Sequence, residues 1–257
     1  MVFGISGQLL NTIMSFIART VLIYVLGDVY AGIAGNFTNI LMVFSLADLG
    51  IGTAIIFALY KPIALEDKEK IRALMGLYAK AYRTIGLVII GLGLCLTPFI
   101  RALVKTDEFI PNLELIFMLY VLNTASSYFL SYKGTLITAN QKNYIVTNVV
   151  YATSIVSYGL QIAILYLTKN YILSLAIQVA TNMAQNIITM IIANRMYPYI
   201  KGRCKNTLSR RERRKIFNNM RALVFYRTGQ VVINGTDSIV ISAMVGIVEN
   251  GFYSNYM

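Results

Sequence analysis

Long apolar runs, separated by short stretches rich in charge, are the feature that most constrains the fold of this chain. Several runs reach about twenty residues, the length at which an α-helix crosses a hydrocarbon core about 30 Å thick. Of the 257 residues, 57% are hydrophobic and 13% are charged, and the mean hydropathy is +0.63. Soluble enzymes, disordered chains, disulfide scaffolds and outer-membrane barrels lack such repeated runs. The sequence therefore predicts an all-α polytopic membrane protein, a bundle of helices.

Hydropathy predicts seven membrane-spanning segments. Their ranges are 5–26, 32–59, 84–104, 113–137, 144–168, 171–194 and 222–248. Before the third segment, Ile71, Leu74, Tyr78 and Tyr82 share one helical face, which predicts a surface helix that leads into it. The third segment carries no stripe of polar side chains, so we expect it to pack at the periphery or to bend.

Lys and Arg are distributed unequally between the predicted connections. If the N-terminus is inside, 19 of them lie on the inner side and 3 on the outer side. The positive-inside rule therefore predicts a cytoplasmic N-terminus. The net charge of +12 then reflects the topology and allows contact with anionic lipid, above all in the basic stretch 195–221. We expect no binding of nucleic acid.

Cysteine and histidine usage limits the chemistry. Cys95 lies within the third predicted span and Cys204 in a cytoplasmic loop, so the two thiols cannot pair. The chain has no His, which excludes a His-containing metal site and a His general base. We expect neither a metal site nor a cofactor, and no enzymatic activity.

An internal repeat is the most informative pattern. Residues 19–37, RTVLIYVLGDVYAGIAGNF, align without gaps on residues 238–256, SIVISAMVGIVENGFYSNY, at an offset of 219. The seventh span comes six spans after the first, so both start from the same side and the repeat is parallel. We therefore predict a two-half transporter with a first six-helix half at 1–194, a basic cytoplasmic linker at 195–221, and the seventh span with the start of the second half at 222–257.

Polar side chains form matching stripes on the first and seventh spans. Asn11, Ser15 and Arg19 recur at helical spacing on the first span, and the repeat extended backward places Asn11 on Gln230 and Ser15 on Asn234. Further stripes follow three other spans, at Asn123, Ser127 and Ser131, at Thr147, Tyr151, Ser154, Tyr158 and Gln161, and at Ser174, Gln178, Asn182, Gln185 and Thr189. One stripe is typical of hydrogen bonds between helices, whereas several indicate a shared wet cavity.

Charged residues at membrane depth are candidate functional groups, because burying a charge there costs a few kcal/mol. Arg19 lies in the first span, Asp48 in the second and Asp237 in the seventh, and Arg227 is close to the cytoplasmic mouth. Two interpretations stay open. Arg19 pairs with an aspartate and holds helices together, or it lines a cavity and binds an anionic substrate.

Four stretches carry a resemblance to a known family: RTVLIYVLGDVYAGIAGNFTNIL, SLADLGIGTAIIFALYKPIA, SYKGTLITANQKNYI and GTDSIVISAMVGIVENGFYSNY. At these residues the chain resembles the polysaccharide flippases, O-antigen type included, of the multidrug/oligosaccharidyl-lipid/polysaccharide (MOP) exporter superfamily. The resemblance implies export of a polyprenyl-pyrophosphate-linked oligosaccharide across the bacterial inner membrane by alternating access. It also implies that the first and seventh helices face a central cavity, where Arg19 and Arg227 would attract the pyrophosphate.

Other functions remain open on the sequence alone. A cation-coupled multidrug or metabolite exporter of the same superfamily would use Asp48 or Asp237 as its titrating acid. A membrane glycosyltransferase or polymerase is disfavoured, since no outer loop is long enough for a catalytic site. A scaffold without transport activity is a further alternative. Other membrane proteins of glycan assembly are candidate partners.

Overall fold

The computed structural model describes residues 2–44, 51–103, 110–201, 214 and 218, and these residues form helices and no strand. The long helices are α1 (Val2–Leu26), α2 (Asp28–Phe44), α3 (Ile51–Ala64), α4 (Lys68–Leu96), α6 (Leu113–Leu130), α8 (Asn143–Thr168) and α9 (Tyr171–Met196). Short helical pieces are η2 (Thr97–Phe99), α5 (Ile100–Leu103), η3 (Ser131–Lys133), α7 (Gly134–Ala139) and η4 (Pro198–Lys201). The protein is a multi-pass membrane protein built as a helical bundle.

Five of the described helical stretches are long and apolar enough to cross a membrane. They are Ser6–Leu26, Lys68–Phe99, Leu113–Ala139, Asn143–Thr168 and Tyr171–Met196. The predicted spans 5–26, 144–168 and 171–194 coincide with α1, α8 and α9, and 113–137 coincides with α6, η3 and α7 together. The predicted span 32–59 overlaps α2, which begins earlier, and α3, which ends later, on either side of residues 45–50. The predicted span 222–248 lies outside the described residues.

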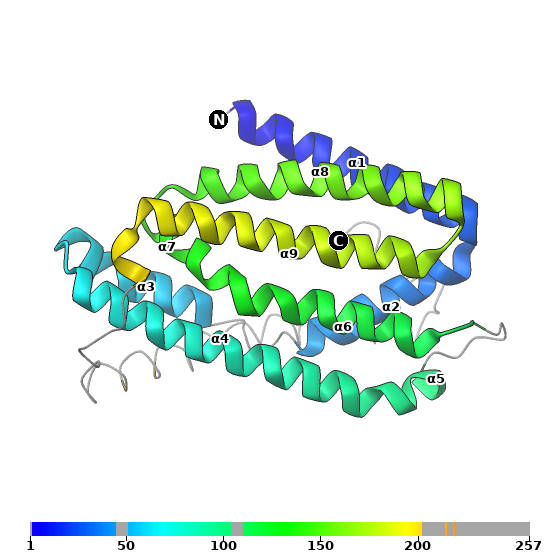
Figure 1. Cartoon of the computed structure of the whole chain (residues 1–257), viewed down its shortest axis with the longest axis horizontal. Coiled ribbons are helices and arrows are strands. Elements are labelled where there is room, and N and C mark those ends of the chain that lie inside the picture. The colour runs from blue at the N-terminus through cyan, green and yellow to red at the C-terminus, as the bar shows by residue number, and fades with distance from the viewer. Residues whose placement is uncertain (1, 45–50, 104–109, 202–213, 215–217, 219–257) are drawn as a thin grey trace, which may run out of the picture.

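The long helices run roughly along the same axis (Figure 1). α1 packs on α8, α8 on α9, α9 on α6, and α6 on α4, so that these five helices form a row. α2 contacts α1 and α6, while α3 contacts α4 and α7. In this row α8 and α9 lie between α1 and α6, although they come after both in the sequence.

The connections alternate between the two ends of the bundle. The α3–α4 and α7–α8 connections lie at one end with the end of α9, whereas the α1–α2 and α8–α9 connections lie at the other (Figure 1). Lys68, Lys142 and Arg195 flank the first end, and Arg101 and Lys169 flank the second. At the second end Gly27, with φ 91°, makes the turn between α1 and α2, a conformation that other residues rarely adopt.

α4 corrects one prediction. The expected surface helix and the third span form one continuous helix, which begins at Lys68 after the Asp67 carboxylate accepts the Lys70 backbone N–H at 2.9 Å. Its apolar face is buried within the bundle instead of lying on lipid headgroups, because Ile71, Tyr78 and Tyr82 join the hydrophobic core. The helix lies along one edge of the bundle, the peripheral position expected (Figure 1).

The interior is divided into an apolar part and a polar part. Around α4 and α6, aromatic side chains pack edge to face, as in the pairs Phe37–Phe117 and Tyr78–Tyr82. The described polar side chains that are fully buried all belong to α8 and α9: Ser157, Ser174, Asn186 and Thr189. The candidate site therefore lies on the α8–α9 side of the bundle.

Candidate functional site

A cavity of about 370 Å³ opens between α1, α2, α6, α8 and α9. Small side chains of α2 form one wall, and α8 and α9 supply most of the polar groups. The lining residues are Ser15, Ala18, Arg19, Leu22, Ala31, Ala34, Gly35, Thr38, Tyr120, Tyr158, Gln161, Leu165, Tyr171, Ser174 and Gln178. We call this space the arginine cavity.

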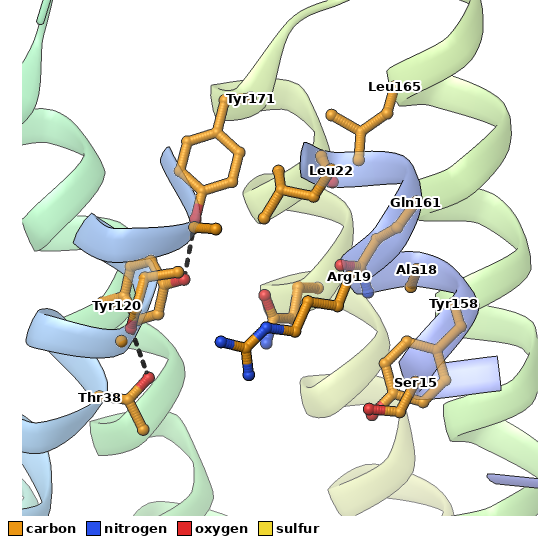
Figure 2. A pocket seen from close by; sticks show the side chains of 15 residues that line it. Ser15, Ala18, Arg19, Leu22, Thr38, Tyr120, Tyr158, Gln161, Leu165 and Tyr171 are labelled. Carbon is orange, nitrogen blue, oxygen red and sulfur yellow. Dashed lines mark hydrogen bonds between the residues drawn. The ribbon is translucent and has the colours of Figure 1, made fainter. Parts of the chain in front are cut away.

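Arg19 supplies the charge of this cavity. Figure 2 shows its side chain extended from α1 into the space that Thr38, Tyr120 and Tyr171 border. The side chain is exposed, and within the described part of the chain no carboxylate or other hydrogen-bond partner contacts the guanidinium. Because Arg19 lines the cavity, an anion bound there can accept hydrogen bonds from its guanidinium.

Two tyrosines fix one border of the arginine cavity. The hydroxyls of Tyr120 on α6 and Tyr171 at the start of α9 are 2.9 Å apart and share a hydrogen bond (Figure 2). The ring of Tyr171 also packs edge to face on Tyr30, with the centroids 5.2 Å apart. Sequence reasoning missed both residues as site residues, since a tyrosine among apolar neighbours is typical of a core or headgroup position.

A second cavity, of about 170 Å³, adjoins the first between α6, α8 and α9. The described lining residues are all polar and none of them is charged: Asn123, Thr153, Ser154, Ser157, Tyr158, Gln161, Gln178, Thr181, Asn182 and Gln185. Tyr158, Gln161 and Gln178 line both cavities. We call this space the amide cavity.

Hydrogen bonds between helices hold the walls of the amide cavity in place. The Ser157 and Thr181 hydroxyls are 2.7 Å apart across α8 and α9, and within α8 the Gln161 amide donates to Ser157 at 2.9 Å. The Asn182 amide donates to the side-chain oxygen of Asn123 at 2.9 Å. The same side chains line the cavity, so these bonds also fix its shape.

The three stripes expected on these spans converge. Asn123, Ser154, Tyr158, Gln161, Gln178, Asn182 and Gln185 belong to the predicted stripes and line the amide cavity. The two interpretations of the stripes, hydrogen bonding between helices and a shared cavity, both hold for this region. Thr153, Ser157 and Thr181 were missed, although each lies within one helical turn of a stripe residue.

The predicted site residues have different outcomes. Arg19 and Ser15 lie together in the arginine cavity. Asn11 does not line it: the residue lies one turn after Gly7, whose backbone packs on Tyr151 of α8, and its amide oxygen has no hydrogen-bond partner in the described residues. Five predicted residues lie outside the described residues: Asp48, Arg227, Gln230, Asn234 and Asp237.

Acidic groups are missing from both described linings. No carboxylate lines either cavity, and the described residues contain no cluster of three or more Cys, Asp or Glu that could hold a metal ion. The cation-coupled alternative depends on Asp48 and Asp237, and it stays a prediction.

Comparison with known proteins adds one finding. A family model described as "Polysaccharide biosynthesis protein" matches residues 2–257. The comparisons with curated proteins and with solved structures give no match.

Proposed function

Because the chain belongs to the polysaccharide biosynthesis protein family, the polysaccharide flippases of the MOP superfamily, we propose that it exports a polyprenyl-pyrophosphate-linked oligosaccharide. Members of this family are transporters rather than enzymes. In the proposal the chain lies in the bacterial inner membrane with its N-terminus in the cytoplasm, and alternating access moves the substrate outward. Anionic lipids and other membrane proteins of glycan assembly are its proposed partners.

The observation that carries the proposal is an arginine that lines a cavity and belongs to a helix long and apolar enough to cross a membrane. Arg19 lies seven residues before the end of α1, about 10 Å along the helix axis. An ionised arginine at such a position costs at least about 2.5 kcal/mol on insertion scales, so it needs a partner or a wet space. The guanidinium fork matches two phosphate oxygens, and the pyrophosphate of a lipid-linked glycan is an anion of that kind.

The amide cavity supports the oligosaccharide part of the proposal. Sugars present many neutral hydroxyls that donate and accept hydrogen bonds, and side-chain amides and hydroxyls do the same. Gln161 and Gln178 line both cavities, so a ligand with its pyrophosphate at Arg19 would reach them with its first sugar. The proposal places the negatively charged group and the sugar in adjoining cavities.

The proposed function is tested by complementation of a glycan-export mutant with the natural gene. We expect Arg19→Ala to lower the amount of exported glycan at least tenfold and Arg19→Lys to retain part of the export. Lys keeps the positive charge but lacks the planar guanidinium that can bind two phosphate oxygens at once. Thr20→Ala is the matched control: Thr20 is the next residue and is exposed, and its one hydrogen bond within the described residues is to Phe16 O of its own helix.

Abundance in the membrane must be equal for all variants, and the lipid-linked glycan in the cytoplasmic leaflet is measured alongside export. Accumulation of this intermediate in the Arg19→Ala cells supports a transport defect. Full export by both Arg19 variants would contradict the proposed role of Arg19 and direct attention to Arg227.

A further inference from the structure

A smaller hollow, of about 120 Å³, lies at the end of the bundle where α4, η3 and η4 meet. The end of α9 and the connection between α3 and α4 lie at the same end (Figure 1). Its lining residues are Arg72, Met75, Gly76, Ala79, Tyr132, Lys133 and Ile200. It shares no lining residue with the arginine or amide cavity. We call it the basic hollow.

Two cations from different elements line the basic hollow, and both are half-buried. The Arg72 Nε donates to the carbonyl oxygen of Tyr199 at 2.7 Å, which fixes the guanidinium against η4. The Lys133 Nζ donates to the Asn194 side-chain oxygen at 2.9 Å. These two bonds hold the cations in fixed positions in the lining of the hollow. Fixed, partly desolvated cations attract anions more strongly than solvated surface charges do.

The space between these cations depends on small residues of α4. A Cβ atom added to Gly76 would meet no heavy atom within 4 Å, and Ala79 follows on the same helical face. Arg83 continues this face one turn further on. Met75 and Ile200 add apolar surface to the wall. The hollow therefore combines positive charge with an apolar wall.

The length of α4 places the basic hollow near the membrane surface. The apolar stretch Lys68–Phe99 has 32 residues and spans about 48 Å, well beyond a hydrocarbon core about 30 Å thick. Its charged residues, among them Lys68, Arg72 and Arg83, all lie in the first half of the stretch, so this half is the part that extends past the core. Arg72 and Gly76 then lie at the level of lipid headgroups.

We propose that the basic hollow binds the phosphate group of an anionic phospholipid, with Arg72 and Lys133 as the binding residues. Basic pockets between helices at the cytoplasmic side of a membrane favour such headgroups, and arginine suits phosphate. The apolar wall of Met75 and Ile200 contacts the glycerol and first acyl carbons. This site consists of its own residues, and its place on the cytoplasmic side rests on the topology given in the proposed function.

The test is native mass spectrometry of the purified protein with phosphatidylglycerol, phosphatidylcholine or inorganic phosphate. We expect the natural protein to retain one phosphatidylglycerol, and the double variant Arg72→Gln/Lys133→Gln to reduce this adduct at least fivefold. Lys68→Gln/Lys142→Gln is the control, because it removes the same charge from exposed positions at the same end.

A third variant, Gly76→Leu, tests whether loss of the adduct comes from a blocked hollow and not from the loss of charge or of the fold. It fills the open space at Gly76, keeps both cations and leaves the bond of Arg72 to Tyr199 in place, so we expect it also to lose the adduct. Equal adducts in all variants, or equal retention of phosphatidylcholine, would overturn the proposal. Retention of inorganic phosphate without any lipid adduct would overturn the lipid assignment and identify a site for soluble phosphate.

Discussion

Single glycines set how closely neighbouring helices approach in this bundle. A Cβ atom on Gly93 of α4 would lie 2.6 Å from a methyl carbon of Val121 on α6, and one on Gly7 of α1 would lie 2.6 Å from the Tyr151 ring on α8. In a membrane, where burial of apolar surface contributes little, such close backbone packing is a main source of attraction between helices. These positions therefore matter more for stability than hydropathy indicates.

The close packing at Gly93 predicts a specific loss of stability. Gly93→Ala brings a methyl group into Val121, and overpacking of this kind costs about 1–3 kcal/mol. Gly91→Ala is the matched control on the same helix, because a Cβ there meets no heavy atom within 4 Å. It should be neutral or stabilising, since Ala favours helix by up to about 1 kcal/mol. Thermal unfolding in detergent measures both.

A third variant checks the cause. Adding Val121→Ala to Gly93→Ala removes the two methyl groups that clash, so part of the lost stability should return. If Gly93→Ala and Gly91→Ala unfold at the same temperature, close packing at Gly93 is not the source of stability.

At the scale of elements, α6, α8 and α9 are joined by side-chain hydrogen bonds as well as by packing. Asn182 on α9 donates to both the main-chain and the side-chain oxygen of Asn123 on α6, at 3.0 and 2.9 Å. Thr153 on α8 donates to Gln185 on α9 at 3.0 Å. These bonds cross the walls of the amide cavity, so the same residues hold the helices together and shape the space.

A double-mutant cycle measures the bond between α6 and α9. Asn123→Ala removes its side-chain acceptor but keeps the main-chain acceptor, so the coupling with Asn182→Ala reports the side-chain bond alone. We expect about 0.6 kcal/mol, the average for such bonds in membranes. Asn123→Ala combined with Thr12→Ala is the control and should be additive, because within the described residues Thr12 hydrogen-bonds only to Gln8 O of its own helix, α1. A coupling of zero between Asn123 and Asn182 would mean that the bond adds no stability.

At the scale of the whole molecule, the alternation of connections between two ends predicts which loops lie on each side of the membrane. Lys142 and Lys169 flank α8 at its two ends, and both are exposed. In a protein whose own cysteines are replaced by serine, Lys169→Cys should react with a membrane-impermeant thiol reagent in intact cells. Lys142→Cys should react only after the membrane is permeabilised. The reverse pattern would contradict the cytoplasmic N-terminus.

Much of the fold could be predicted from the sequence, because membrane spans depend on additive, local properties. The apolar runs predicted α1, α8 and α9 to within a few residues, since a helix must satisfy its backbone hydrogen bonds wherever water is absent. The continuity of α4 could not be predicted, because its charged first half resembles a surface helix in composition. Tertiary packing decided what covers its apolar face, since Ile71 and Tyr78 lie in the core of the bundle.

The sequence by itself determined which residues are polar at helical spacing, and thus the candidate stripes of Arg19, Gln161 and Gln178. Only the tertiary structure decided that these three line one cavity, that Asn11 does not, and that Tyr120 and Tyr171 do. The physical reason is that a stripe fixes one face of a helix but not the neighbour that this face meets. That neighbour depends on the rotation of each helix about its axis and on its distance from the adjacent helix. Contacts between helices, such as that of Gly7 with Tyr151, determine both.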